Sequence, residues 1–354
     1  MSVTGQPVGI GLVGAGAYGD FCLAAFADVP EVRIAAICDT DAVRARHFAG
    51  LYGTPAYTKL EALLEDPAVE IVALNTPPFL HAAQGIDSLR AGKHLFCEKP
   101  LAMRIEEGEA MRAAAERAGV RLTVDYVMRS NPLWRAAAEI RASGVLGGLL
   151  HMDLANHAAG LSLPASHWFW DKAKSGGIWV EHGVHFFDAF AWVAGADGTI
   201  TAAQAFVNGA GQEDRVEALA RYGSAAAHFY HGFTHDGMSE QTTIRLAFER
   251  GDVTLWEWVP TLMEVDSVRP GLIDTVRSFL PGSVRVEEAP GGLMRLNARL
   301  TEGKSAVYRR CIQEGIRDLA GAVRNPGVPL RVTAEHGLAS LRMAADAERL
   351  GRPR

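Results

Sequence analysis

The stretch VGIGLVGAGAYG, residues 8–19, decides how the first part of the chain folds. An apolar run leads directly into Gly14, Gly16 and Gly19, which form a GxGxxG pattern. In a strand–turn–helix unit the first glycine permits a tight turn, the second lets the backbone approach a pyrophosphate, and the third allows close packing of helix on strand. Ala17 and Tyr18 would then open a helix whose amino terminus faces the anion. Alone the pattern is weak, because glycine-rich turns without a ligand are common.

A carboxylate twenty residues beyond the last of these glycines strengthens the interpretation. Asp39 ends the second apolar run, where a carboxylate can accept hydrogen bonds from the ribose hydroxyls of an adenosine. The same charge would repel a 2′-phosphate, so the sequence favours NAD over NADP, with Arg44 and Arg46 as the residues that could reverse this preference. The alternative role for Asp39 is to cap the helix that starts near Asp41.

Apolar runs and helical periodicity alternate through the first third of the chain, which is typical of βαβ units that build a parallel sheet. This pattern predicts a doubly wound α/β domain of the Rossmann type over residues 1–129. The expected strands are 8–13, 32–38, 71–74, 94–97 and 121–127, and the expected helices are 20–27, 41–52, 80–91 and 105–118.

The pattern changes after Asn131 and Pro132, where alternating segments follow one another without intervening helices. Such segments predict a mostly antiparallel sheet in a second, α+β domain over residues 130–354. We expect the last helix to be able to pack back toward the first domain. The expected strands are 199–208, 217–222, 225–233, 242–249 and 252–258, and the expected helices are 133–143, 302–323 and 333–350.

The bulk composition of the chain favours an enzyme with a small-molecule partner. The 354 residues are 48% hydrophobic and 21% charged, with a net charge of −6, so no basic surface points to nucleic acid or anionic lipid. Four scattered cysteines form no disulfide framework and suit a reducing compartment. Without a basic region before the first apolar run, and without a long apolar span, we expect a cytoplasmic protein.

Two further motifs carry groups suited to hydride transfer, which needs an acceptor for the hydroxyl proton and a donor or cation beside the oxygen. Glu98-Lys99-Pro100 follows the expected strand 94–97, at the edge where doubly wound sheets bind ligands. Proline keeps the preceding lysine extended, and so out of the next helix.

The second motif, GGIWVEHGVHFFD at residues 176–188, reads as a glycine turn that feeds a helix. At four-residue spacing Glu181 can hydrogen-bond His185 and support it as a general base. The alternative is a helix whose polar residues lie on a solvated face. His182 would point away from the helix face that Glu181 and His185 share, as a surface or packed residue.

In these motifs, together with Asn75-Thr76-Pro77-Pro78 and His81, the chain resembles the Gfo/Idh/MocA oxidoreductases over nearly its whole length. The resemblance implies an open-faced C-terminal sheet, a homodimer or homotetramer, and catalytic roles for Lys99 and His185. Glu181 replaces the aspartate of many members and would position substrate or orient the histidine. The implied cofactor contacts are Gly14, Gly16, Ala17, Tyr18, Gly19, Asp39, Asn75, Thr76, Pro77, His81, Glu98 and Lys99, and the implied substrate contacts are Lys99, Tyr126, His157, Trp168, Glu181 and His185.

The resemblance leaves three functions open. The first is an NAD(P)-dependent dehydrogenase or reductase that acts on a secondary hydroxyl or ketone of a sugar, inositol or related polyol. The second keeps NAD bound and oxidises the substrate transiently during elimination or glycoside cleavage. The third is a non-catalytic sensor that binds NAD.

Several weaker features have equally plausible packing roles. Tyr126 and Arg129 lie near the expected domain junction, and an aromatic such as Trp168 packs as often as it stacks on a ligand. Asn156, His157 and His167 are expected in or near a loop beside it. The histidines at 228, 231 and 235 do not predict a metal, because Glu-His-x-x-His is not the zinc pattern His-Glu-x-x-His.

Overall fold

Six parallel strands form the first sheet, in the order β3-β2-β1-β4-β5-β6. The computed structural model describes residues 6–351 of the chain. The direction of strand addition reverses between β1 and β4, so loops after these strands diverge at the carboxyl edge of the sheet. The strands are β1 (Val8–Val13), β2 (Val32–Cys38), β3 (Ala56–Tyr57), β4 (Ile71–Leu74), β5 (His94–Cys97) and β6 (Leu122–Val124).

Local capping sets the ends of the helices that connect these strands. The side chain of Asp41 accepts hydrogen bonds from the backbone N–H groups of Val43 and Arg44, and Gly53 ends the same helix in the left-handed conformation. Asp41 is therefore the cap of this helix, and the capping alternative for Asp39 is wrong. The helices are α1 (Ala17–Ala27), α2 (Ala42–Tyr52), α3 (Leu60–Leu64), α4 (Pro78–Arg90) and α5 (Ile105–Ala118).

The second sheet has nine strands in the order β14-β15-β13-β12-β11-β7-β10-β9-β8, and it is antiparallel except for the β7·β10 pair. This confirms the predicted fold class of a parallel Rossmann sheet and a mostly antiparallel second sheet. The strands are β7 (Leu149–His157), β8 (Gly198–Val207), β9 (Glu213–Tyr222), β10 (Ala225–Gly232), β11 (Gln241–Phe248), β12 (Gly251–Trp256), β13 (Leu262–Val268), β14 (Ser283–Ala289) and β15 (Leu293–Arg299).

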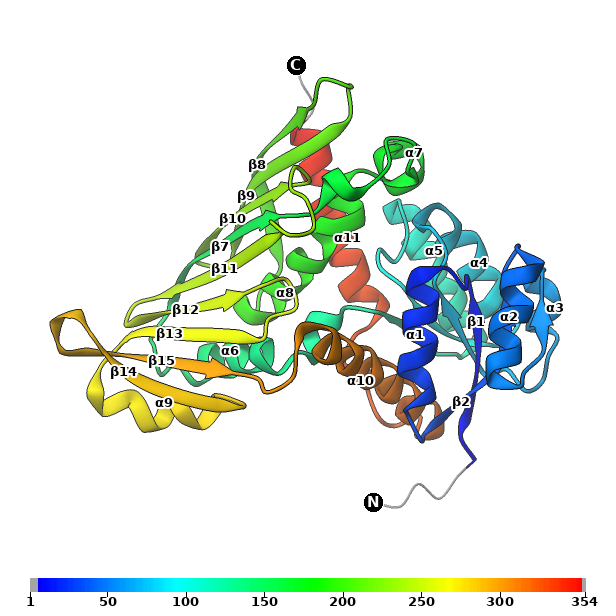
Figure 1. Ribbon diagram of the computed structural model, residues 1–354, viewed down its shortest axis with the longest axis horizontal. Helices are drawn as coiled ribbons and strands as arrows, with labels where there is room; N and C mark the ends of the chain where they lie inside the picture. Colours follow the sequence, from blue (N-terminus) through cyan, green and yellow to red (C-terminus); the bar gives the residue numbers. More distant parts are fainter. Residues whose placement is uncertain (1–5, 352–354) are drawn as a thin grey trace. The chain divides into compact units, whose positions relative to one another are not determined.

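One face of this sheet packs on helices α6 (Pro132–Ser143) and α8 (Val184–Ala194), which lie along the same side of it (Figure 1). The core between them is aromatic. The ring of Phe229 on β10 lies 4.9 Å from that of Phe187 and 4.7 Å from that of Phe190. Because α8 is buried over most of its surface, its sequence is apolar nearly all round.

The chain divides into two units, and each unit is made of several separate stretches of the sequence. The first unit comprises residues 6–127, 173–176 and 309–341, and the second comprises the rest up to residue 351. The sequence predicted domains of 1–129 and 130–354. In the structure residues 173–176 and 309–341 belong to the first unit instead of the second, and residues 128–129 belong to the second instead of the first. Residues 1–5 and 352–354 of the predicted domains lie outside the described residues.

Two long helices near the end of the chain are shared between the units. The described part of the chain has α10 (Lys304–Arg324) and α11 (Ala334–Gly351), and the division falls after Tyr308 and after Leu341, inside each of them. Over residues 6–351 no helix is both long enough and apolar enough to cross a bilayer.

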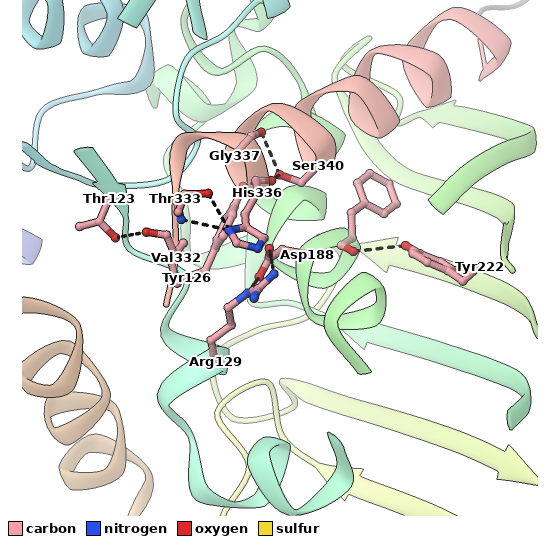
Figure 2. A network of polar contacts seen from close by, with 11 residues as sticks. Thr123, Tyr126, Arg129, Asp188, Tyr222, Val332, Thr333, His336, Gly337 and Ser340 are labelled. Atoms are coloured by element: carbon pink, nitrogen blue, oxygen red, sulfur yellow. Dashed lines mark hydrogen bonds and ion pairs between the residues drawn. The ribbon is translucent and has the colours of Figure 1, made fainter. Parts of the chain in front are cut away.

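A buried ion pair ties α8 to the start of the second unit (Figure 2). Arg129 binds Asp188 through two parallel bonds, Nε to Oδ2 at 2.8 Å and Nη2 to Oδ1 at 2.9 Å. The side chains are only 11% and 2% exposed. Burial raises the pKa of Asp188, although the guanidinium opposes that rise. The two-pronged geometry keeps this carboxylate charged inside the unit.

Removing one partner of this pair should strongly destabilise the protein. Arg129→Met leaves the Asp188 carboxylate buried without its cation, and we expect a loss of about 3–5 kcal/mol in the free energy of unfolding. The matched control is Arg245→Met, whose 3.0 Å pair with Asp252 has the arginine side chain 60% exposed; that change should cost no more than about 1 kcal/mol. Urea denaturation followed by tryptophan fluorescence measures both, and equal losses would contradict the assignment.

Candidate functional site

The glycine loop packs so closely on its neighbours that two of its positions exclude a side chain. Gly14 has a φ of +91°, and a Cβ added there would lie 2.8 Å from the Asn75 carbonyl oxygen. A Cβ on Gly19 would lie 2.2 Å from the Gly14 carbonyl oxygen. At Gly16 an added Cβ meets no atom within 4 Å, so the space above this residue is open. That space suits a group brought in from outside, such as a pyrophosphate.

The Asp39 side chain is hydrogen-bonded to the backbone of this loop. Its Oδ2 accepts a hydrogen bond from the Ala15 N–H at 2.9 Å, and its Oδ1 accepts one from the Asp41 N–H at 2.9 Å. The residue is 7% exposed, while the Arg44 guanidinium, 45% exposed, reaches Oδ2 at 3.2 Å. A fixed carboxylate at the end of β2 is what recognition of a ribose diol requires. Of the two arginines that bear on cofactor preference, Arg44 touches this carboxylate.

Hydrogen bonds to the first strand and the first helix fix the loop after β4. Asn75 donates its N–H to the Val13 carbonyl at 2.8 Å and its side-chain amide to the Cys22 sulfur at 3.2 Å, which leaves its Oδ1 buried without a partner among the described residues. The Thr76 hydroxyl donates to Gln84 at 2.7 Å, and Pro77 directly precedes α4. The buried amide oxygen offers an acceptor that a bound ligand could satisfy.

His81 links two of the loops rather than lining the site. It is fully buried, and its ring nitrogens lie 2.7 Å from the Pro100 carbonyl oxygen and 2.8 Å from that of Thr76. Burial lowers its pKa, against the effect of both carbonyls. The predicted contact of His81 with the cofactor is therefore corrected to a supporting role, because no part of its ring reaches the surface.

Glu98 and Lys99 follow β5 at the same carboxyl edge. The Lys99 N–H donates to Glu98 Oε2 at 3.2 Å, and the peptide bond to Pro100 is cis. Lys99 is half-buried, whereas Glu98 is 7% exposed. Tyr18, predicted as a cofactor contact, directs its hydroxyl to Asp125 Oδ2 at 3.4 Å. Apart from the buried His81, the structure thus gathers the predicted cofactor residues around the carboxyl ends of β1, β2, β4 and β5.

In the second unit, the predicted helix begins as a π-helical turn, Trp179–Gly183, and continues as α8. Such turns are frequent at functional sites. His185 is 4% exposed and Asp188 is 3% exposed, so neither lies on a solvated face. The His185 ring lies 6.0 Å from that of Trp258, a neighbour for which the sequence held no signal. Glu181 is half-buried, and its hydrogen bond to His185 remains a prediction.

A buried polar cluster anchors this turn to the sheet. The side-chain amide of Asn156 on β7 lies 3.2 Å from His182 Nε2 and 3.3 Å from His231 Nδ1, and its Oδ1 accepts from the Thr242 hydroxyl at 2.7 Å. Both ring nitrogens must be unprotonated to accept from the amide. Burial lowers the pKa of His231 well below its usual value, helped by His182 and opposed by Glu181. His182 is therefore a packed residue that fixes the turn.

His157 is separated from this cluster by strand alternation. It follows Asn156 on β7, so its side chain points to the opposite face, where its ring lies 5.2 Å from Tyr230 and 4.9 Å from His235. Both residues lie at the end of β7, next to the loop that follows it, as predicted. The sheet therefore groups Asn156, rather than the predicted His157, with the segment that carries Glu181.

Trp168 and Tyr126, the other two predicted substrate contacts, lie in different parts of the chain and have different neighbours. Trp168 is half-buried in a short 3₁₀ turn, Trp168–Trp170, with its ring 5.3 Å from that of His167. Tyr126 is 3% exposed, and its hydroxyl contacts that of Ser340, while the nearby Thr123 hydroxyl donates to the Val332 carbonyl at 2.9 Å (Figure 2). These contacts lie within the first unit, and the contact of Tyr126 with substrate stays a prediction.

Two family models match the chain. The first, described as an oxidoreductase family with an NAD-binding Rossmann fold, covers residues 8–126. The second, the GFO/IDH/MocA C-terminal domain, covers residues 134–254. These matches confirm the predicted NAD-binding Rossmann domain.

Curated relatives match with moderate identity. An uncharacterized oxidoreductase of Synechocystis is 32% identical over 40% of this chain and 38% of that protein. The 1,5-anhydro-D-fructose reductase of Ensifer adhaerens is 31% identical over 57% of this chain and 62% of that protein. The chain thus spans less than two thirds of the length of either. The rhizopine catabolism protein MocA of Rhizobium meliloti is 27% identical over 96% of this chain and 94% of that protein.

Solved structures share the whole fold. An oxidoreductase domain protein from Kribbella flavida superposes with a TM-score of 0.83 at 24% identity, covering 98% of this chain and 97% of that one. A levoglucosan dehydrogenase in complex with NADH and levoglucosan superposes with a TM-score of 0.80 at 18% identity, covering 97% of this chain and 98% of that one.

The open space above Gly16 allows dinucleotide binding to be separated from folding. Gly16→Ala should leave the thermal midpoint unchanged but weaken NAD binding by on the order of tenfold, or ~1.4 kcal/mol, because the added methyl meets the pyrophosphate. Gly50→Ala makes the same change on α2, also into open space, and should not alter NAD affinity. Titration calorimetry measures both affinities. An unaltered affinity in Gly16→Ala would mean that the loop holds no pyrophosphate.

Acid should destabilise the protein partly through His231. Its pKa is lowered in the folded state, so the unfolded chain binds more protons, and stability falls as the pH drops below about 6.5. His231→Gln should flatten the dependence of the thermal midpoint on pH. His151→Gln, at an exposed position on the same sheet, should not. Thermal scans from neutral to acid pH provide the comparison, and parallel curves for wild type and His231→Gln would refute this role.

Proposed function

The chain belongs to the Gfo/Idh/MocA oxidoreductases, and from this premise we propose that it is an NAD-dependent dehydrogenase acting on a secondary hydroxyl of a sugar or related polyol. One observation carries the proposal: the carboxyl edge of the first sheet assembles the glycine loop, Asp39 and Lys99. The reductase named for 1,5-anhydro-D-fructose and the dehydrogenase solved with levoglucosan support a sugar-like substrate.

The residues have distinct roles in the proposed reaction. NAD, when bound, supplies the acceptor for the hydride that leaves the substrate carbon. His185 accepts the proton of the hydroxyl on that carbon, and Lys99 stabilises the charge that develops on the oxygen as it becomes a carbonyl. Glu181 orients substrate hydroxyls or the His185 ring. The reverse reduction uses the same groups, with His185 returning the proton.

The cofactor preference follows from Asp39. Its carboxylate faces the position of the adenosine ribose and repels a 2′-phosphate, so NAD is preferred. Arg44 Nη1 lies 3.2 Å from Asp39 Oδ2, and the positive charge of this guanidinium reduces the repulsion between Asp39 and a 2′-phosphate. We therefore infer a preference for NAD with residual use of NADP.

Substrate oxidation by two variants tests the assignment. A panel of cyclic polyols, aldoses, deoxy- and amino-sugars with NAD or NADP, followed by absorbance of the reduced cofactor, identifies the substrate. On that substrate, Lys99→Ala and His185→Ala should each lower kcat by about 10²–10⁴-fold while NAD still binds. The exposed positions Lys59→Ala and His151→Ala are matched controls and should retain wild-type rates.

The outcomes separate the alternatives. Normal turnover in either active-site variant would eliminate that residue from the chemistry. A cofactor that copurifies with the protein, with turnover independent of added NAD, would favour transient oxidation. Binding of NAD without turnover on the whole panel would favour a sensor. The homodimer or homotetramer and the cytoplasmic location remain predictions.

A further inference from the structure

Three polar side chains lie in a row across the second sheet. Asn156 on β7 is paired with Thr242 on β11 and with His231 on β10, so the three residues stand side by side on neighbouring strands. Asn156 and Thr242 are each 2% exposed, and His231 is fully buried. We call Thr242, Asn156 and His231 the polar row. Buried polar groups reduce stability unless they find partners, so the polar row calls for a physical explanation.

Asn156 stands at the centre of the polar row and uses both ends of its side-chain amide. Its Nδ2 lies 3.2 Å from His182 Nε2 and 3.3 Å from His231 Nδ1. Its Oδ1 accepts from the Thr242 hydroxyl at 2.7 Å. The amide nitrogen carries two protons, and a ring nitrogen accepts one of them only when it is itself unprotonated. Each ring is therefore held in one neutral tautomer, with the proton on Nδ1 in His182 and on Nε2 in His231.

His182 connects the polar row to the proposed base. It follows Glu181 in the π-helical turn, and its ring lies 6.2 Å from that of His185 on α8. The other rings that pack on it, at 5.6, 5.3 and 5.3 Å, are those of Phe186, Phe233 and His231. The acidic group whose charge reaches this cluster is Glu181. A neutral His182 does not oppose protonation of His185, whereas a charged ring at this distance would.

We propose that Asn156 is a positioning residue for the proposed proton transfer: through its hydrogen bond to His182 it holds the π-helical turn on the sheet and orients the ring beside His185. The proposal rests on the function above. Asn156 is itself fixed by strand pairing and by the Thr242 hydroxyl, so it provides a rigid reference for the turn. A displacement of the turn would move Glu181 and His185, and a misplacement of about 1 Å can lower a rate by on the order of 10²-fold.

A double-mutant cycle on kcat tests the proposal. Asn156→Leu and His182→Leu each break the hydrogen bond but still fill the space, so each should lower kcat by about 10–100-fold without changing NAD affinity. Because Asn156 acts through His182, the double variant should stay within about threefold of the slower single variant. His182→Gln retains an acceptor and should recover kcat to within about threefold of wild type. His151→Leu, at an exposed position on β7, is the matched control and should keep the wild-type rate.

Magnetic resonance of the histidine rings tests the hydrogen bonds without any need for turnover. In protein carrying isotope-labelled histidine at neutral pH, the ring nitrogens should show His182 protonated on Nδ1 and His231 protonated on Nε2. Spectra of His182→Gln and His231→Gln assign the two rings by loss of their signals. In Asn156→Leu the His182 ring should no longer be held in one tautomer. A wild-type His182 ring protonated on Nε2 would show that Asn156 does not donate to it, and would overturn the proposal.

The kinetic outcomes are equally decisive. Additive losses in the cycle, or a wild-type kcat in Asn156→Leu together with a lower thermal midpoint, would show that Asn156 only stabilises the fold. If the leucine variants fail to fold, Thr242→Val, which removes the hydroxyl that orients the amide, should lower kcat by about fivefold, whereas Thr242→Ser keeps that hydroxyl and most of the rate. Equal rates in these two variants would reject the role of Asn156. A wild-type protein that shows both tautomers but turns over no substrate would overturn the proposed function, and with it any role in proton transfer.

Discussion

The close approach of the glycine loop to the backbone after β4 is the constraint on which the candidate site depends. Gly14 can lie against the Asn75 carbonyl only because it has no Cβ and adopts a positive φ. This contact draws together the ends of β1 and β4 at the point where strand order reverses. Asp39, the Asn75 loop and Lys99 then lie around one edge of the sheet. A side chain at Gly14 would push apart the ends of β1 and β4.

The parts of the fold that sequence alone predicts are those where periodicity and burial agree. The first four predicted strands of the Rossmann sheet match the structure residue for residue, because each is mostly apolar and mostly buried. The predicted strand 121–127 ends at Val124, since the polar Asp125 and a 3₁₀ turn follow it. Strands β14 and β15 escaped prediction because both mix charged and apolar residues and are only partly buried.

In the candidate site too, the sequence predicts only those residues whose type is required at a particular place. Glycine spacing and the motif at Glu98 identify the cofactor edge, since each needs a particular residue type at a particular place. Asp125 carries no such signal, although it occupies the same register after β6 that Glu98 occupies after β5. Asn156 and His157 differ by one residue, and only the pairing of β7 decides which of them faces the helix. A π-helical turn has no recognisable periodicity over five residues.

The division of α10 and α11 between the units has a consequence for how the chain is made. The first unit uses residues 309–341, which leave the ribosome after almost all of the second unit has been synthesised. The nucleotide-binding unit, although it is translated first, must therefore complete its tertiary structure late, with its early segments exposed to chaperones in the meantime. An expression fragment that stops after the parallel sheet would lack part of its own unit, so truncation at residue 127 does not isolate a domain.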